Sequence, residues 1–182
     1  DLHKEYRRQR QMCIRDRNAG AKSFYIGIGD TATNDLGMGM LYSLGARFFD
    51  DEGNELNPIA KNMVNVETID ISNMDHRIFD ADITIATSTD MTLFGENSFL
   101  ESRVYRKGAS IEDIAFLYKG SKNFKEKIEQ TLGINPLDMP TLGSGGGVAW
   151  ALYTFFKTKI SKSMDAVSYT HLTLPTILLV EI

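Results

Sequence analysis

The residues best suited to chemistry lie in one glycine-rich stretch, GIGDTATNDLGMGM, at positions 27–40. Glycines such as Gly27 and Gly29 let backbone amides approach an anion closely. The hydroxyls of Thr31 and Thr33 add further hydrogen-bond donors. A helix that begins directly after such a loop contributes a partial positive charge at its N-terminus. The stretch therefore has the composition of a phosphate-binding loop.

Two aspartates, Asp30 and Asp35, belong to the same stretch. A carboxylate beside bound phosphate can accept a proton from a substrate hydroxyl, or hold a magnesium ion that bridges nucleotide phosphates. The spacing matches neither a Walker P-loop, which needs a glycine–lysine pair, nor a dinucleotide fingerprint. On spacing alone, a strand-to-helix turn capped by an aspartate is the favoured interpretation, and the anion-binding loop is the alternative.

A second glycine-rich loop, GSGGG at positions 143–147, opens directly onto an apolar segment. Gly145 and Gly146 are candidates for a second contact with substrate or phosphate, because this loop also precedes a predicted helix. Lys107 lies beside a glycine just before another predicted helix. For Lys107, a phosphate contact and an ordinary surface lysine both stay open.

Strands and helices alternate around these loops. β-Rich runs predict strands at 23–28, 47–49, 66–71 and 82–87, with a hairpin turn at 51–54. Apolar spacing predicts helices at 37–44, 57–63, 110–133 and 148–156. The helix predicted at 110–133 begins with a capping box formed by Ser110 and Asp113, and it ends at Gly133. The sequence therefore predicts an α/β fold with a mixed sheet.

The two ends differ from the rest in composition. Residues 1–17 are crowded with arginine and lack helical periodicity, and residues 167–182 turn to threonine and leucine without polar alternation. Both ends resemble translated sequencing-adapter remnants, QMCIRDR and VSYTHLTLP. We therefore interpret both ends as non-native and assign the fold to residues 18–166. A basic arm and an edge strand are the disfavoured alternative.

The composition excludes several classes of protein. The 182 residues are 42% hydrophobic and 24% charged, with a net charge of -4 and no basic face interleaved with aromatics, so we expect no nucleic-acid partner. Cys13 is the only cysteine, which excludes an intramolecular disulfide and a cysteine-based zinc site. No apolar run approaches the roughly 18 residues of a spanning helix. We expect a cytoplasmic protein without membrane contact, and its oligomeric state is not indicated.

The loop at 27–40 resembles a motif of the glycerate kinase family: Gly-Ile-Gly, Ser/Thr-Ala-Thr, an aspartate two residues later, then Gly-Met-Gly-Met. The similarity continues in order through 44–48, 75–78 and 107–109. It implies an enzyme that transfers phosphate from ATP, with Mg²⁺, to D-glycerate, giving 2-phosphoglycerate. It also implies a two-domain fold. This chain lacks the motifs of the Rossmann-like domain, so we expect mainly the inserted α/β domain, inactive by itself.

The resemblance assigns roles to individual residues. Asp35 falls on the motif aspartate, which makes it the candidate for orienting or deprotonating glycerate or for holding metal. The residues expected to bind substrate or phosphate are Gly27, Gly29, Asp30, Thr31, Thr33, Lys107, Gly145 and Gly146.

The sequence also departs from the family pattern. Asp30 and Leu36 replace glycines of the motif, and Ser88 stands where the family usually has an aspartate. Asp90, two residues further on, is the candidate catalytic substitute. Trp150 stands where a small glycine is usual, and its indole is expected to crowd a ligand. These departures leave a divergent, non-catalytic ligand-binding or regulatory homologue as the alternative function.

Overall fold

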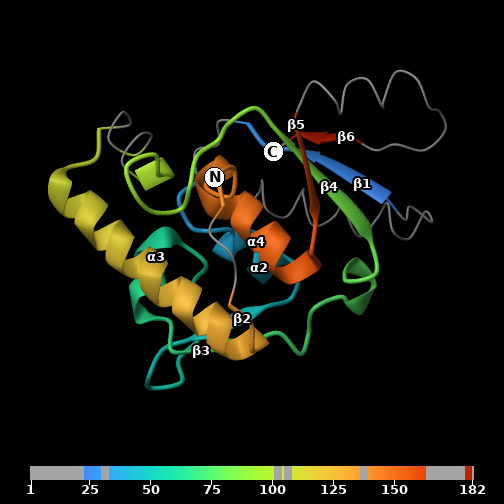
Figure 1. The fold of residues 1–182 in the computed structure, drawn as a ribbon. Coiled ribbons are helices and arrows are strands. Elements are labelled where there is room, and N and C mark those ends of the chain that lie inside the picture. Colours follow the sequence, from blue (N-terminus) through green and yellow to red (C-terminus); the bar gives the residue numbers. More distant parts are fainter. Residues whose placement is uncertain are drawn as a thin grey trace, which may run out of the picture.

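The main sheet consists of four parallel strands in the order β5-β4-β1-β6 (Figure 1). The computed structural model describes residues 23–29, 33–100, 104, 108–135, 139–162 and 179–181. Within these residues the sheet strands are β1 (Ser23–Gly27), β4 (Asp82–Thr87), β5 (Lys159–Lys162) and β6 (Leu179–Glu181). Because every pairing is parallel, the carboxyl ends of the strands meet at one edge of the sheet.

A separate antiparallel pair joins β2 (Arg47–Phe49) to β3 (Thr68–Asp70), with Phe48 opposite Ile69. The hairpin expected at the turn 51–54 forms, but it is short. An antiparallel bridge joins Phe49 to Glu55, and Leu56 N donates to Phe48 O at 2.8 Å. The Asp50 carboxylate closes this turn by accepting the amides of Glu52 and Asn54 at 3.1 and 2.8 Å. The two sheets together confirm the predicted α/β class with mixed strand directions.

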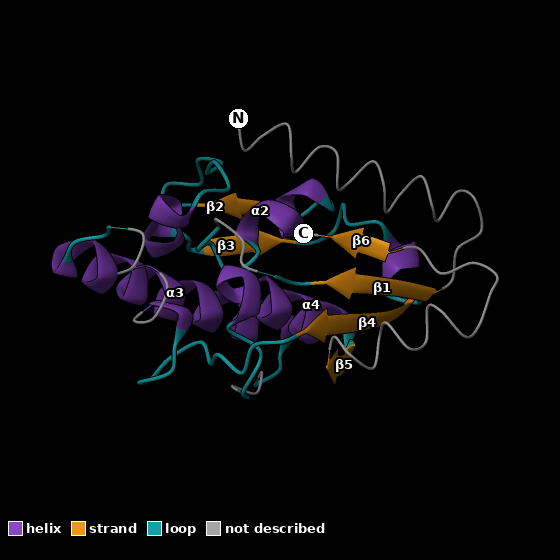
Figure 2. Ribbon diagram, turned by 90° about the horizontal axis from the view of Figure 1, so that it is seen from above, coloured by secondary structure: helices purple, strands orange, loops and turns teal. Residues whose placement is uncertain are grey.

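The described residues include the α-helices α2 (Met38–Ser43), α3 (Ile111–Leu132) and α4 (Val148–Phe156). Both views place α4 between α3 and the strands β1 and β4 (Figures 1 and 2). The long helix α3 begins as predicted, because Ser110 and Asp113 form a complete capping box. It ends at Gly133, which adopts the left-handed conformation with φ 63°.

The helix predicted at 57–63 differs from the structure. A 3₁₀ helix, η1, spans Ala60–Asn65, and its N-cap is the extended residue Ile59 rather than Asn57. The physical reason lies 60 residues away, where Asn123 of α3 donates to the carbonyls of Met63 and Val66 at 3.0 and 2.8 Å. Those carbonyls are therefore bound to a side chain rather than to an α-helical ladder. In the described part of the chain, η2 (His76–Ile78) and η5 (Ser144–Gly147) are also 3₁₀ segments.

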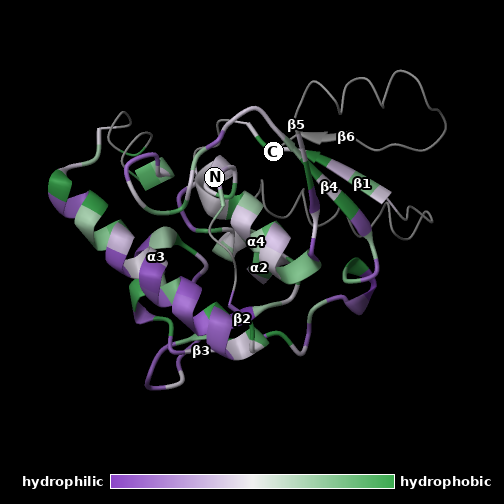
Figure 3. Ribbon diagram, viewed as in Figure 1, coloured by the Kyte–Doolittle hydropathy of each residue, from purple (hydrophilic) through white to green (hydrophobic). Residues whose placement is uncertain are grey.

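The core fills the space between the helices and the sheet. Buried residues alternate along β1 and β4, and hydrophobic positions follow the same strands in Figure 3. Phe48 of β2 packs edge-on against Phe124 of α3, with ring centroids 5.4 Å apart. Trp150 of α4 is fully buried. The expectation that its indole crowds a ligand is therefore wrong, because the side chain belongs to the core.

The C-terminal stretch contributes one described element. Residues 179–181 form β6, which pairs in parallel with Tyr25, Ile26 and Gly27. β6 lies at the edge of the sheet, as the alternative that the composition of 167–182 disfavours would have it. The assignment of both ends as non-native stays a prediction, and residues 1–17 lie outside the described residues. Among the described helices, none combines the length and the apolar character needed to cross a bilayer.

Candidate functional site

Three loops converge where β1 and β4 end. The loop after β1 hydrogen-bonds the glycine-rich loop, because Leu36 N donates to Gly146 O at 3.1 Å. The loop after β4 joins the same glycine-rich loop, because Gly143 N donates to Met91 O at 2.8 Å. In open parallel sheets, ligands bind at the carboxyl edge of the strands. This convergence is therefore the candidate functional site.

Asp35 caps α2 from inside the first loop. Its side chain is buried, and its Oδ1 accepts Gly37 N at 3.1 Å and the Thr33 hydroxyl at 2.5 Å. Its Oδ2 accepts Gly39 N at 3.0 Å. These bonds confirm the interpretation that spacing alone favours, a strand-to-helix turn capped by an aspartate. The proposed contact of Asp35 with glycerate or metal stays a prediction.

The next residue carries backbone strain. Leu36, which replaces a glycine of the motif, has φ 50°, a left-handed value that glycine adopts more readily. Its side chain is fully buried. Packing of Leu36 in the core therefore holds the loop in a conformation that costs about 1–3 kcal/mol locally.

The glycine-rich loop packs against the first loop without space for side chains. Gly145 and Gly146 are buried, and both have φ 63°. A Cβ added at Gly146 would lie 1.9 Å from Thr33 O. A Cβ added at Gly143 would lie 2.1 Å from Thr92 O, on the loop after β4. In this structure the glycines bring the three loops together, and their predicted contact with phosphate stays a prediction.

A cluster of hydroxyl groups connects β4 to the glycine-rich loop. Ser144 Oγ lies 2.5 Å from Thr89 Oγ1 and accepts a hydrogen bond from Thr87 Oγ1 at 3.3 Å. Ser144 and Thr87 are buried. Sequence analysis missed this cluster, because its members are 55 and 57 positions apart and only the fold brings them together.

Asp90 and Ser88 have a different setting from Asp35. Both are exposed on the loop that leaves β4. The backbone carbonyl of Asp90 accepts a hydrogen bond from the Asn97 side chain at 3.0 Å, which holds the loop. Of the two candidate catalytic carboxylates, Asp90 is therefore open to solvent and Asp35 is enclosed.

The remaining predicted residues fall into two groups. Gly27 ends β1, and Gly29, two residues further on, is exposed. Among the described atoms, none lies within 4 Å of a Cβ added at Gly29. Asp30, Thr31 and Lys107 lie outside the described residues.

A pocket of about 710 Å³ adjoins the first loop at Asn34. Sites for small molecules commonly have volumes of about 300–1,000 Å³. Its walls come from η1, from the first half of α3 and from the segment before α3, through Asn34, Lys61, Val104, Gly108, Ala109, Asp113, Phe116 and Leu117.

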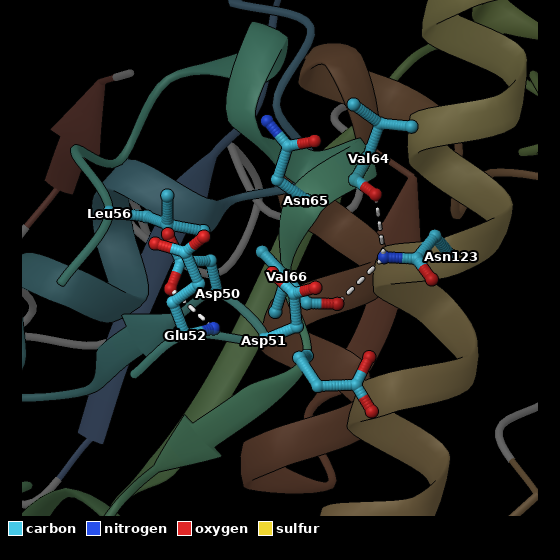
Figure 4. A pocket seen from close by; sticks show the side chains of 9 residues that line it. Asp50, Asp51, Glu52, Leu56, Val64, Asn65, Val66 and Asn123 are labelled. Atoms are coloured by element: carbon cyan, nitrogen blue, oxygen red, sulfur yellow. Dashed lines mark hydrogen bonds between the residues drawn. The ribbon is translucent and has the colours of Figure 1, made fainter. Parts of the chain in front are cut away.

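A second pocket, of about 410 Å³, has an acidic wall (Figure 4). Its lining includes Asp50, Asp51, Glu52 and Glu67. Hydrogen bonds, the largest from the backbone of Asn54, hold the pKa of Asp50 below its ordinary value. A wall of carboxylates disfavours phosphate or carboxylate ligands. The pocket beside Asn34 is therefore the better candidate for an anionic substrate.

A metal site made only of protein groups does not fit the described residues. In the described part of the chain, three or more histidine, cysteine, aspartate or glutamate side chains are nowhere grouped to hold an ion. Both oxygens of Asp35 already accept backbone amides.

Comparison with known proteins gives consistent matches. The model of the glycerate kinase family matches residues 11–175, which includes parts of both ends that composition sets apart. Glycerate kinase of Bacillus subtilis (strain 168) is 31% identical over 150 residues, covering 82% of this chain and 39% of the relative. Glycerate 2-kinase of Escherichia coli (strain K12) is 32% identical over 160 residues, covering 87% of this chain and 42% of the relative.

A solved structure agrees with these matches. The crystal structure of a candidate glycerate kinase 2 from Salmonella typhimurium LT2 superposes with a TM-score of 0.82 at 28% identity. The superposition covers 95% of this chain and 48% of the solved chain. The chain thus spans about two fifths of the length of the curated relatives above.

Proposed function

The chain belongs to the glycerate kinase family, and from that premise we propose that it is part of an ATP-dependent kinase that phosphorylates D-glycerate to 2-phosphoglycerate. The reaction moves a phosphoryl group to an alcohol, and its partners are small molecules in the cytoplasm. The observation that carries the proposal is the convergence of three loops at the carboxyl edge of the sheet, one of them bearing the family motif. ATP with Mg²⁺ would supply the phosphoryl group and neutralise its charge.

The two candidate carboxylates have different roles in this proposal. Asp35 is a positioning residue in this proposal, because its carboxylate fixes the turn into α2 through Gly37 and Gly39. Asp90 is exposed at the end of β4 and is the group available to accept the proton of the glycerate hydroxyl.

In this proposal, the start of the first loop binds the anion. Gly27 and Gly29 provide backbone amides there, and Asp30 and Thr31 follow them. Thr33 already donates its hydroxyl to Asp35, so its part is to hold the loop. Lys107, Gly145 and Gly146 complete the proposed set of phosphate contacts.

We further propose that the 182 residues do not catalyse the reaction alone. Phosphoryl transfer needs charges that converge on the transferred group from several elements. The chain covers 39% of the Bacillus subtilis relative, so more than half of such a protein lies outside the match.

The test compares two proteins, the 182-residue chain and a protein of the relatives' length that contains it. ADP formation is measured with ATP, magnesium and D-glycerate, and the product is identified by ³¹P NMR. We expect glycerate-dependent ADP and 2-phosphoglycerate only from the longer protein. Absence of glycerate-dependent ADP from the longer protein would refute the proposal.

Two observations favour the alternative, a non-catalytic ligand-binding homologue. Ser88 lacks the carboxylate usual at its position, and Asp35 is enclosed by its own loop. Calorimetry separates the two functions. Binding of D-glycerate or ATP to the longer protein without turnover supports the alternative, and turnover that Asp90→Asn abolishes supports the kinase.

A further inference from the structure

We infer that Lys61 forms a subsite for a small anion in the pocket beside Asn34. This inference rests on the proposed function and deepens it, because the anion is either the carboxylate of the acceptor or a phosphate of the donor. Sequence analysis did not select Lys61, which lies in a segment without a chemical motif. The pocket alone brings it next to the family loop.

The pocket lies beside the loop that carries the family motif. It adjoins the first loop through Asn34, which is the neighbour of Asp35 in sequence. Since Asp35 fixes the turn through Thr33, Gly37 and Gly39, the placement of Asn34 is tied to that of the family motif. A ligand in this pocket would therefore touch the loop that carries the family resemblance.

The pocket contains a lysine that can hold an anion. Among the residues that the structure describes, its lining holds one cation, Lys61, and one carboxylate, Asp113. Asp113 accepts hydrogen bonds from the backbone and hydroxyl of Ser110 at 2.9 and 2.7 Å, so its charge serves the N-terminus of α3. Lys61 is exposed and forms no ion pair with any residue that the structure describes. Its ammonium group is therefore available to a ligand.

The remaining walls complete a small-anion site. The Asn34 amide can donate hydrogen bonds to an oxyanion. Val104, Phe116 and Leu117 form an apolar side, which suits the carbon atoms of a small acid. One cation, one amide and an apolar wall suit a small hydroxy acid or a terminal phosphate better than a large polyanion.

The test measures binding to the 182-residue chain by calorimetry, with D-glycerate, inorganic phosphate and ATP titrated separately at two salt concentrations. Lys61→Met should weaken binding about tenfold and reduce its salt dependence, because a charge-assisted contact is lost. Lys61→Arg should keep the affinity within a few fold. Lys119→Met, at an exposed lysine of α3 outside the pocket lining, should change nothing.

The three ligands separate the two sources of the anion. A loss confined to D-glycerate assigns Lys61 to the acceptor carboxylate, and a loss shared by phosphate and ATP assigns it to the donor. Equal affinities for Lys61→Met and Lys119→Met, or no anion binding by the unmodified chain, would overturn the inference. Anion binding that depends on Lys61, in a longer protein without turnover, would leave the inference standing and refute the kinase.

Discussion

The contact between the two glycine-bearing loops can be tested with a single methyl group. Gly146 has φ 63° and ψ 29°, and it is buried against the first loop. Gly133, at the end of α3, has almost the same backbone conformation, with φ 63° and ψ 30°, but it is exposed. Replacing each by alanine imposes the same left-handed strain, while only Gly146→Ala places a Cβ against a neighbour.

The structure gives the expected difference in stability between the two alanine variants. The added Cβ would lie 1.9 Å from Thr33 O at Gly146, whereas at Gly133 none of the described atoms lies within 4 Å. The left-handed conformation costs alanine about 1–2 kcal/mol at both sites. Moving the first loop by about 1 Å to relieve the clash should cost a further 1–3 kcal/mol, as overpacked cores do. We therefore expect Gly146→Ala to be less stable than Gly133→Ala by about 2 kcal/mol.

The assay is urea unfolding followed by circular dichroism, with both variants measured beside the unmodified chain. A difference of about 2 kcal/mol corresponds to roughly 4–8 °C in Tm for a chain of this length. Thermal unfolding therefore gives an independent measurement. Equal losses of stability at Gly133 and Gly146 would show that the two loops do not pack at the distance described, and the candidate site would lose its geometric basis.

Three further predictions follow from other contacts. Asp35→Asn should destabilise the chain by about 1–3 kcal/mol in urea unfolding, because the amide replaces one acceptor of buried donors. Unchanged stability would contradict its role as a cap. The pKa of Asp113 is lowered, chiefly by the Ser110 hydroxyl, so its contribution to stability is complete above its ordinary pKa of 3.8 and is lost as the pH falls through the lower folded value. In an NMR titration, Ser110→Ala should raise the pKa of Asp113, and an unchanged pKa would refute this assignment. Asn123→Ala should cost about 1–3 kcal/mol by removing the side-chain donor to the carbonyls of Met63 and Val66, whereas exposed Asn65→Ala should cost little. Equal effects of the two asparagine variants in urea unfolding would argue against the anchoring of α3 through Asn123.

Elements with local signals could be predicted from sequence. The bounds of α3 follow from Ser110 and Gly133, which act on the backbone within one turn of each helix end. The strands β1 and β4 have β-rich runs that end in a glycine or threonine before a polar loop. The capping role of Asp35 was also accessible, because its partners Gly37 and Gly39 lie within four residues.

Elements that depend on distant partners could not be predicted. The strand β5 is four residues long and forms because β4 offers a free edge, which its own sequence does not reveal. The 3₁₀ helix η1 depends on Asn123, about 60 residues further along the chain. The hydroxyl cluster at Ser144 and the pocket at Lys61 likewise arise only when separate segments meet.

The strand order of the main sheet affects how the chain folds during synthesis. Tyr25 of β1 pairs with Thr84 on one side and with Leu179 on the other. At about 5–20 residues per second, a ribosome needs roughly 5–20 s to extend the chain from the first partner to the second. During that interval one side of β1 keeps open backbone groups, which can pair with another nascent chain. For a chain that carries this C-terminal strand, translation speed and chaperone access should therefore affect the yield of folded protein.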